Sequence, residues 1–283
     1  MSKPFTCEKN YVGNFGFPVW ENPTEIMVQA AFDHHGLAFR YITTEVPADD
    51  LAAAFAGVKA MGYRGFNCTL PHKVAIIEHL DGLGESAALM GAVNCVVERD
   101  GRYIGENTDG KGFLESLSPV VDPASKRVLI FGAGGAARAV SVELALAGAA
   151  SITIVNRTIE RGEELVALLN AKTEVPSTLV AWHGDHPIPS DVDIVVNSTS
   201  IGLSPDTSRV AVDATTLRPG LLVADIIPNP PRTRLLAEAE AAGCQTIDGL
   251  GMLVNQGKLG IQYWTGIEPD TAVMRAALEA IFA

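Results

Sequence analysis

A glycine cluster near the middle of the chain constrains the fold more than any other feature. An apolar run at residues 127–131 leads directly into Gly132-Ala133-Gly134-Gly135-Ala136-Ala137, and a helical pattern follows. The first glycine permits a tight turn, the second lets the backbone approach a bound pyrophosphate, and the final alanine keeps the helix close to the strand. The helix N-terminus adds N–H donors for phosphate. The cluster therefore predicts a dinucleotide-binding domain, and this context disfavours the alternative of a glycine-rich turn without a ligand.

The residues after the cluster alternate between strand and helix patterns. Continuous apolar strands that alternate with helices indicate a buried parallel sheet. Strands are expected at residues 151–155, near 179, at 192–196 and at 221–225, with helices to about 146 and at 159–169. The segment before the cluster, residues 118–126, has the composition of a linker.

The first part of the chain also mixes strands and helices. Strands are expected at residues 11–16, 37–44 and 65–70, and helices at 23–35, 47–61, from Pro71 onward and from Thr108 or Asp109 to 117. Asp100-Gly101 is a strong signal for the turn of a hairpin. Two more helices are expected at residues 248–266 and 269–282.

The length of 283 residues suits two domains. We expect an α/β protein in which residues 1–112 and 247–283 form a substrate-binding domain. Residues 113–246 would form a Rossmann domain, and both halves of the active site would face the cleft between the domains.

Charge and composition exclude several classes of partner. The formal net charge is −12, so nucleic acid and anionic membranes are poor partners. No run reaches the roughly 18 apolar residues of a transmembrane helix, and residues 1–10 lack the apolar core of a secretion signal. The four scattered cysteines (Cys7, Cys68, Cys95 and Cys244) suit reduced thiols, so we expect a cytoplasmic enzyme. We expect it to be a monomer or a homodimer.

The six histidines give no indication of a metal. His183 and His186 flank Asp185 in a loop, but no further ligand lies at metal-binding spacing. We therefore expect no metal, and we note His72 only because it adjoins Lys73.

The end of the second strand of the dinucleotide domain indicates which nicotinamide cofactor is bound. NAD-binding domains usually place a carboxylate there to bind the ribose 2′-hydroxyl. Here the strand ends in Asn156-Arg157-Thr158, with Arg161 one turn later. Two guanidiniums and a hydroxyl suit a 2′-phosphate, so the sequence predicts NADP.

Three polar segments of the first half carry candidate chemistry. They are residues 67–73 (NCTLPHK), 91–94 (GAVN) and 105–110 (GENTDG). Separately, Lys73 is compatible with a solvated charge, Asn94 with a turn residue and Asp109 with a helix cap. Together, in this order and spacing, they resemble the shikimate dehydrogenase family. The glycine cluster, Asn156–Thr158, the N-S-T segment at 197–199 and the D-G-L-G-M-L-V-N-Q segment at 248–256 extend the resemblance along almost the whole chain.

The resemblance implies a role for each matching residue. Lys73 and Asp109 would be the catalytic pair, with Lys73 passing a proton to and from the oxygen at the reacting carbon. Substrate hydroxyls would be bound by Thr69, Asn94 and Gln256. The cofactor would contact Gly132, Ala133, Gly134, Gly135, Ala136, Asn156, Arg157, Thr158, Arg161, Ser198, Thr199 and Gly249.

The chain departs from the family at one end of the substrate. The family usually has Ser-x-Ser-Pro after the first strand, and its two hydroxyls bind the substrate carboxylate. Here the segment is Trp20-Glu21-Asn22-Pro23, and Pro228 stands where the family has a tyrosine. Lost hydrogen bonds to a charged group are worth about 1.5–3 kcal/mol each, so shikimate binding would weaken tenfold or more. Alternatively, Trp20 and Asn22 bind the same carboxylate through other atoms.

Three hypotheses follow. The first is an NADP-dependent shikimate dehydrogenase that reduces 3-dehydroshikimate in aromatic amino acid biosynthesis, the chorismate pathway. The second is a paralogue that acts on quinate, an amino-analogue or another cyclic alcohol. The third, a non-enzymatic NADPH-binding regulatory protein, is disfavoured by the intact Lys73 and Asp109.

Overall fold

The computed structural model describes residues 9–282, which form two compact units. The first unit comprises residues 9–108 and 257–281, and the second comprises residues 109–256. The domain boundaries expected from the sequence stay a prediction, because compactness alone does not show that each part folds independently. Cys7 lies outside the described residues; Cys68, Cys95 and Cys244 form no disulfide.

The first unit contains a mixed sheet of order β2-β1-β3-β5-β6-β4. β1 pairs in parallel with β2 and β3, whereas β5 is antiparallel to both β3 and β6. Asp100 and Gly101 join β5 to β6 with positive φ angles of 52° and 79°, as the hairpin prediction required. The strands are β1 (Asn10–Gly16), β2 (Phe39–Glu45), β3 (Gly65–Cys68), β4 (Gly82–Leu83), β5 (Cys95–Arg99) and β6 (Arg102–Glu106).

Helices pack on this sheet around a core that includes Phe15, Phe55 and Phe66. Helix α2 (Leu51–Met61) stops at Gly62, which adopts the left-handed conformation with φ 69°. The unit also contains α1 (Thr24–His34), α3 (His72–Ala75), α4 (Glu85–Met90) and α10 (Thr271–Phe282), with short 3-10 turns η1 (Ala48–Asp50) and η2 (Ile76–His79). Helix α9 (Gly249–Thr265) contributes residues 257–265 to this unit.

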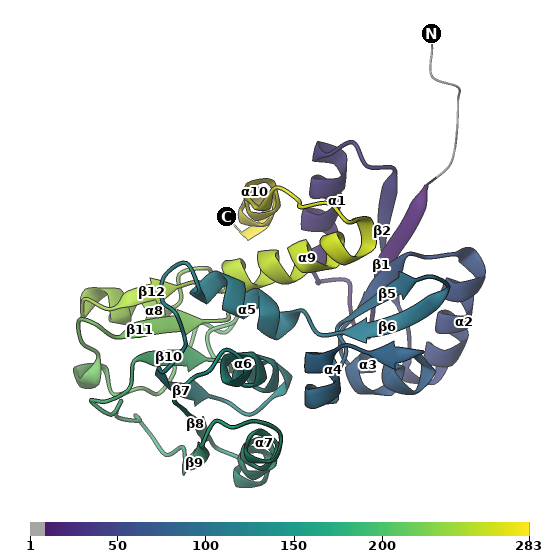
Figure 1. Cartoon of the computed structure of the whole chain (residues 1–283). Coiled ribbons are helices and arrows are strands. Elements are labelled where there is room, and N and C mark those ends of the chain that lie inside the picture. Colours follow the sequence, from purple (N-terminus) through teal and green to yellow (C-terminus); the bar gives the residue numbers. More distant parts are fainter. Residues whose placement is uncertain (1–8, 283) are drawn as a thin grey trace. The chain divides into compact units, whose positions relative to one another are not determined.

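The second unit contains an all-parallel sheet, which confirms that prediction (Figure 1). Its order is β12-β11-β10-β7-β8-β9, so the chain reverses direction across the sheet between β7 and β10. Ligands of such sheets bind at the carboxyl ends of the strands where this reversal occurs. The strands are β7 (Arg127–Phe131), β8 (Ser151–Asn156), β9 (Ser177–Ala181), β10 (Ile194–Asn197), β11 (Leu222–Asp225) and β12 (Gln245–Ile247).

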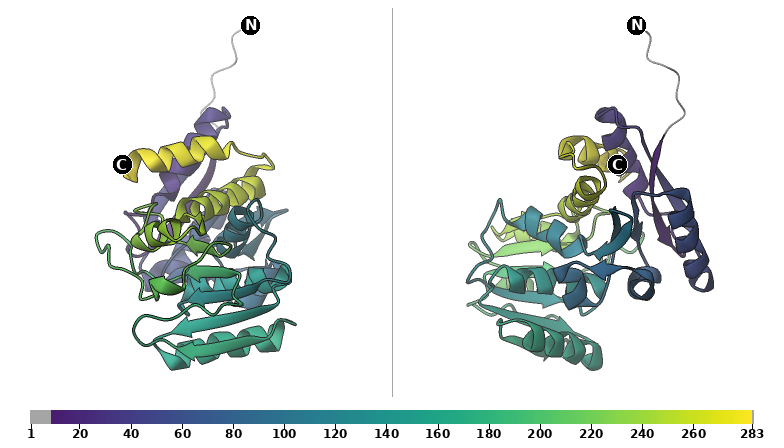
Figure 2. Two further views of the ribbon diagram at one scale, coloured as in Figure 1. Left: turned by 90° about the vertical axis from the view of Figure 1, so that its left-hand side faces the viewer. Right: turned by 45° about the vertical axis from the view of Figure 1, so that its right-hand side comes forward.

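The helices of the second unit lie along these strands. Helix α6 (Gly135–Leu146) contacts β7 and β8, and α7 (Ile159–Lys172) contacts β8 and β9. Figure 2 shows helices beside the strands of this unit in two further views. Helix α8 (Arg234–Ala241) lies along β11 and β12. The remaining elements are α5 (Asp109–Leu117), η3 (Ala214–Thr216) and the first half of α9. None of the described helices has the length and apolar character of a membrane span.

Candidate active site

In the first unit, two loops that follow parallel strands lie side by side. β1 and β3 end at the same edge of the sheet, and the Phe17 N–H donates to Leu70 O at 2.9 Å. Gly16 is required at this point, because a β-carbon there would lie 2.3 Å from Thr69 Cγ2. The close approach brings the segment around Trp20 next to the polar segment at residues 67–73.

A cavity of about 340 Å³ lies between these loops and is lined by Pro18, Val19, Trp20, Glu21, Asn22, Glu45 and Thr69. The Trp20 side chain is 67% exposed, so its ring forms an accessible wall. Asn22 Oδ1 accepts from the Thr24 N–H at 3.0 Å and so supports the start of α1. The structure thus brings together three predicted substrate residues: Trp20, Asn22 and Thr69.

Glu45 is a member of this cavity that the sequence analysis missed. It is the last residue of β2, in register with Gly16 of β1. Glu45 Oε1 accepts from the Val19 N–H at 3.1 Å, which orients the loop that carries Trp20. With Glu21, two carboxylates therefore line the cavity where the family resemblance places the substrate carboxylate.

Lys73 lies in the single turn of α3. Its backbone carbonyl accepts from the Val93 N–H at 2.7 Å, which ties the turn to the segment before β5. Burial raises the pKa of the neighbouring Cys68 thiol, and the positive charge of Lys73 acts in the opposite direction. His72 is buried and its Nε2 lies 2.7 Å from Val46 O, an acceptor, so the ring donates there and has a structural role.

Asn94, a predicted substrate-binding residue, is hydrogen-bonded within the protein to Thr108. Its Oδ1 accepts from the Thr108 N–H at 2.7 Å, and its Nδ2 donates to Thr108 Oγ1 at 3.0 Å. Its backbone carbonyl accepts from the Asn67 amide at 3.1 Å. Asn94 is therefore fixed between the polar segment at residues 67–73 and the chain that leads into Asp109.

Asp109 and Gln256 belong to the second unit, whereas Lys73 belongs to the first. Asp109 is the first residue of α5, where the sequence predicted a helix start at Thr108 or Asp109, and Gln256 is buried on α9. Within the second unit these helices pack closely, because a β-carbon on Gly112 would lie 2.6 Å from the Gln256 nitrogen. Asn255 Nδ2 also donates to Ser116 Oγ at 3.0 Å.

The glycine cluster has the geometry of a pyrophosphate site. Gly132 adopts φ 104°, and a β-carbon there would meet Ser198 O at 3.1 Å. Added β-carbons at Gly134 and Gly135 would meet no atom within 4 Å, so the backbone is open to a ligand there. Helix α6 begins at Gly135, and its N-cap is Gly134, which has no side chain to cap the first N–H groups; these groups suit a phosphate.

The segment after β10 adds a buried hydroxyl beside the cluster. Ser198 Oγ is buried and has no partner among the described residues, and a ligand would satisfy it. Thr199 donates from its N–H and hydroxyl to Asn197 Oδ1, at 3.1 and 2.7 Å. Asn197 Nδ2 in turn donates to Asp225 at 3.0 Å. Burial raises the pKa of Asp225 to about 6, while the hydrogen bonds from Thr233, Ile227 and Asn197 lower it.

The predicted 2′-phosphate residues follow β8. Asn156 Nδ2 donates to Thr158 O at 2.7 Å and shapes the turn into α7. Arg157 and Arg161 are exposed, and Arg157 Cζ lies 6.0 Å from the centroid of the Trp182 ring. The donors fit an anionic dinucleotide. Trp182 was missed, because a single tryptophan 25 residues from Arg157 gives no local signal.

Two further residues of the predicted site have packing explanations. A β-carbon on Gly249 would lie 2.3 Å from Ile227 O, so this glycine is needed where α9 begins. Pro228, the second departure from the family, is half-buried in the loop that follows β11. Gly249 stays a predicted cofactor contact.

Comparisons with known proteins agree along the whole chain. The family model of the shikimate dehydrogenase substrate binding domain matches residues 15–96, that of shikimate / quinate 5-dehydrogenase matches residues 116–240, and that of the shikimate 5′-dehydrogenase C-terminal domain matches residues 249–279. The shikimate dehydrogenase (NADP(+)) of Moorella thermoacetica is 45% identical over 271 residues, 94% of this chain and 92% of the relative.

Two solved structures are similar in both sequence and fold. The ligand-free 5-ketofructose reductase of Gluconobacter sp. strain CHM43 is 54% identical, with a TM-score of 0.96 over 98% of this chain and 100% of that one. A shikimate dehydrogenase in complex with NADP+ is 38% identical, with a TM-score of 0.89 over 97% and 96% of the two chains.

The fold and the site define a dinucleotide-dependent oxidoreductase. The chain belongs to the shikimate dehydrogenase family, and its function is of the shikimate dehydrogenase type. The fold class and the enzyme class predicted from the sequence are confirmed.

Proposed function

We propose that this chain catalyses reversible hydride transfer between NADPH and a ketone of a small polyhydroxylated substrate. NADP is the cofactor of this shikimate dehydrogenase-type reaction. When bound, NADPH supplies the hydride to the carbonyl carbon. The protein has to orient the ketone, supply a proton to its oxygen and exclude water.

Lys73 supplies that proton in the proposed mechanism. Its ammonium stabilises the negative charge that develops on the oxygen and passes a proton to it. Asp109 is the other member of the proposed catalytic pair and accepts from a substrate hydroxyl. Thr69, Asn94 and Gln256 bind the other hydroxyls, which matters because each buried polar group left without a partner costs about 1–3 kcal/mol.

The cofactor residues divide into backbone and side-chain groups. The open backbone around Gly134 and the N-terminus of α6 suit the pyrophosphate. Arg157, Arg161 and Thr158 clamp the 2′-phosphate in this proposal. The remaining contacts are assigned to Gly132, Ala133, Gly135, Ala136, Asn156, Ser198, Thr199 and Gly249.

One observation carries the choice of substrate: Glu21 and Glu45 line the cavity beside Trp20 and Asn22. Two carboxylates in one small cavity repel an anion, and neither serine hydroxyl of the family pattern is present. We therefore propose an uncharged polyhydroxy ketone as the substrate. The Gluconobacter relative is named for the reduction of such a compound, 5-ketofructose.

3-Dehydroshikimate is the second candidate substrate. The curated relatives are named as shikimate dehydrogenases, and Thr69, Asn94 and Gln256 stand in segments that match the family pattern. In that case Asn22 and the Trp20 N–H bind the carboxylate, and the enzyme serves aromatic amino acid biosynthesis. Quinate or an amino-analogue would use the same residues.

The test compares initial rates of NADPH oxidation with 5-ketofructose and with 3-dehydroshikimate, and of NADP+ reduction with shikimate and with quinate. We expect kcat/KM for 5-ketofructose to exceed that for 3-dehydroshikimate by tenfold or more. The reverse order would establish the second candidate. No turnover of any of them, with NADP binding intact, would favour a regulatory protein.

The proposal also includes a cytoplasmic location and a monomeric or homodimeric state. The unbridged cysteines support the location. Light scattering on the purified protein distinguishes a monomer from a dimer.

A further inference from the structure

We propose that Trp182 is a positioning residue that holds Arg157 for the 2′-phosphate and so sets the preference for NADP over NAD. The inference rests on the cofactor half of the proposed function and is independent of the substrate. It concerns a tryptophan just beyond β9, in a cavity of about 450 Å³ that Arg157, Ser200 and Arg209 also line.

The position of the Trp182 ring is determined from three directions. Its backbone N–H donates to Asn156 O at 3.0 Å, which extends the pairing of β9 with β8 up to the residue before Arg157. The ring packs on Phe131 at the end of β7 in a tilted arrangement, with 5.0 Å between centroids. Its indole Nε1–H is shared between Gly184 O and Ala211 O, both at 3.1 Å. A ring held in this way is a rigid platform.

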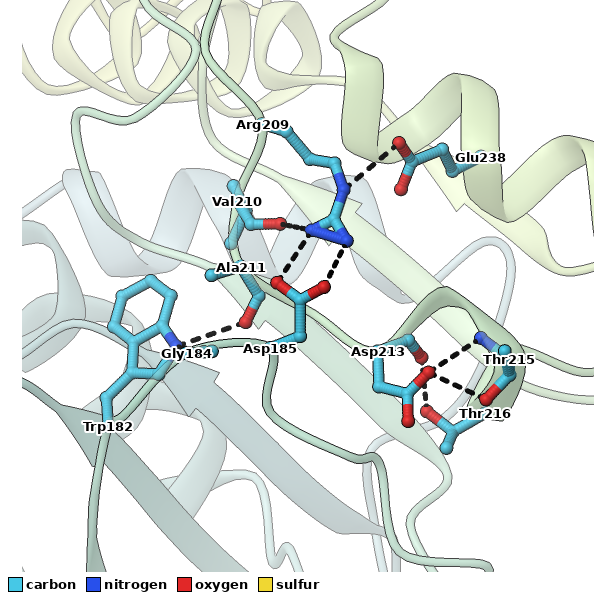
Figure 3. A network of polar contacts seen from close by, with 10 residues as sticks. All are labelled: Trp182, Gly184, Asp185, Arg209, Val210, Ala211, Asp213, Thr215, Thr216 and Glu238. Atoms are coloured by element: carbon cyan, nitrogen blue, oxygen red, sulfur yellow. Dashed lines mark hydrogen bonds and ion pairs between the residues drawn. The ribbon is translucent and has the colours of Figure 1, made fainter.

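An ion pair holds together the two segments whose carbonyls accept from Trp182 (Figure 3). Arg209 donates to both oxygens of Asp185, at 3.0 and 2.6 Å, in the bidentate arrangement that gives geometric specificity. Asp185 follows Gly184, and Arg209 lies two residues before Ala211. The same segments are joined by the His186 N–H, which donates to Ala211 O at 2.9 Å.

The charges of this cavity distinguish its two arginines. Arg209 contacts Asp185 and also Glu238, with Nε 3.4 Å from Glu238 Oε1, so its charge is balanced within the protein. Among the described residues no carboxylate pairs with Arg157. Its guanidinium lies over the Trp182 ring instead. Arg157 therefore keeps a positive charge for an anion, and the aromatic face limits the positions of its guanidinium.

Trp182 affects the discrimination between NADP and NAD rather than the binding of both cofactors. NADP differs from NAD only by the 2′-phosphate, so a residue that orders Arg157 affects the binding of ligands that carry this phosphate. If Trp182 had a purely structural role, its loss would weaken the binding of NADP and of NAD equally. A cation–π contact at a partly exposed site corresponds to about a two- to fivefold change in affinity.

The experiment measures calorimetric dissociation constants of 2′,5′-ADP and 5′-AMP, which carry or lack the 2′-phosphate and require no turnover. Trp182→Leu should weaken the binding of 2′,5′-ADP about two- to fivefold more than the binding of 5′-AMP. Trp182→Phe keeps an aromatic face and should show a smaller selective loss. Equal losses for the two ligands in the Leu variant would overturn the proposal.

A double-variant cycle tests whether the effect passes through Arg157. In an Arg157→Ala background, Trp182→Leu should cause no further selective loss; a loss as large as in the wild type would contradict the proposal. If the Leu variant does not fold, Asp185→Asn serves instead, because its side chain is 55% exposed. It should cause a selective loss, and an unchanged ratio would overturn the proposal. The matched control is Asp191→Asn, which removes a surface ion pair with Arg127 and should leave both constants unchanged.

Discussion

The candidate ligand sites of the two units are built in different physical ways. In the second unit, most groups suited to the cofactor belong to the backbone: the turn at Gly132, the open chain at Gly134 and the N-terminus of α6. In the first unit, the cavity at the carboxylate end consists of side chains on a loop, among them Trp20, Glu21 and Asn22. Backbone recognition depends on the fold and resists substitution. Side-chain recognition on a loop changes without affecting the sheet, and this chain departs from its family there.

The largest expected effect separates chemistry from cofactor binding. Lys73→Ala should lower kcat by at least about 10²-fold, because it removes the group that protonates the substrate oxygen. The dissociation constant of NADP should change less than twofold, because the cofactor residues belong to the second unit. Rates and calorimetry test both values. Lys59→Ala is the matched control, and activity of the Lys73 variant within tenfold of wild type would refute the assignment.

The next effect tests the main side-chain contribution within the second unit. Arg157→Ala should raise the KM for NADP about 10- to 100-fold, since hydrogen bonds to a charged phosphate contribute about 1.5–3 kcal/mol. The KM for NAD should change little. Equal changes for the two cofactors would show that the 2′-phosphate is held elsewhere.

Restoring the family's serines tests the loop of the first unit. The double variant Trp20→Ser with Asn22→Ser should lower the KM for shikimate about tenfold, because it returns two hydroxyl donors for a carboxylate. The same double variant should weaken the binding of the uncharged substrate. Asn22→Ser keeps a side-chain oxygen that can accept from the Thr24 N–H, so the start of α1 stays supported. Unchanged KM values for both substrates would show that this loop does not contact them.

Adding Glu45→Gln to that double variant isolates the acidic charge. Glutamine keeps the acceptor for the Val19 N–H and removes the carboxylate charge. We expect a further decrease of about two- to fivefold in the KM for shikimate, and a smaller effect at high salt because salt screens exposed charges. A decrease that does not depend on salt would argue against an electrostatic origin.

The smallest effect concerns stability beneath the cofactor site. The raised pKa of Asp225, about 6, means that the folded state binds the proton more tightly than the unfolded state. The contribution of Asp225 to the free energy of unfolding is therefore full below about pH 4 and is lost as the pH rises through 6. Asp225→Asn is neutral at every pH, so its stability relative to wild type should increase by about 1 kcal/mol from pH 5 to 7.5.

Urea midpoints of both proteins at the two pH values measure this difference. Asp213→Asn is the control, because hydrogen bonds from Thr215 lower the pKa of that exposed carboxyl. Its contribution changes only at acidic pH below this range, and the control should show no such slope. A constant difference between Asp225→Asn and wild type would refute the raised pKa.

Much of the fold could be predicted from the sequence, because its signals are local. The apolar run before Gly132, the Asp100-Gly101 turn and the stop at Gly62 each depend on a few neighbouring residues. The short elements β4, β12, α4 and α8 were not predicted. They span two to eight residues, too few for a periodic pattern to emerge.

The sequence by itself determined the family chemistry: the glycine cluster, the arginines after β8, and the motifs that carry Lys73 and Asp109. Tertiary structure decided which side chains surround them. Parallel pairing of β1 and β2 placed Glu45 beside the Trp20 loop, and the loops after β9 and β10 placed the Trp182 ring against Arg157. These contacts join residues 25 or more positions apart. The register and packing of whole strands determine them, and no local pattern contains that information.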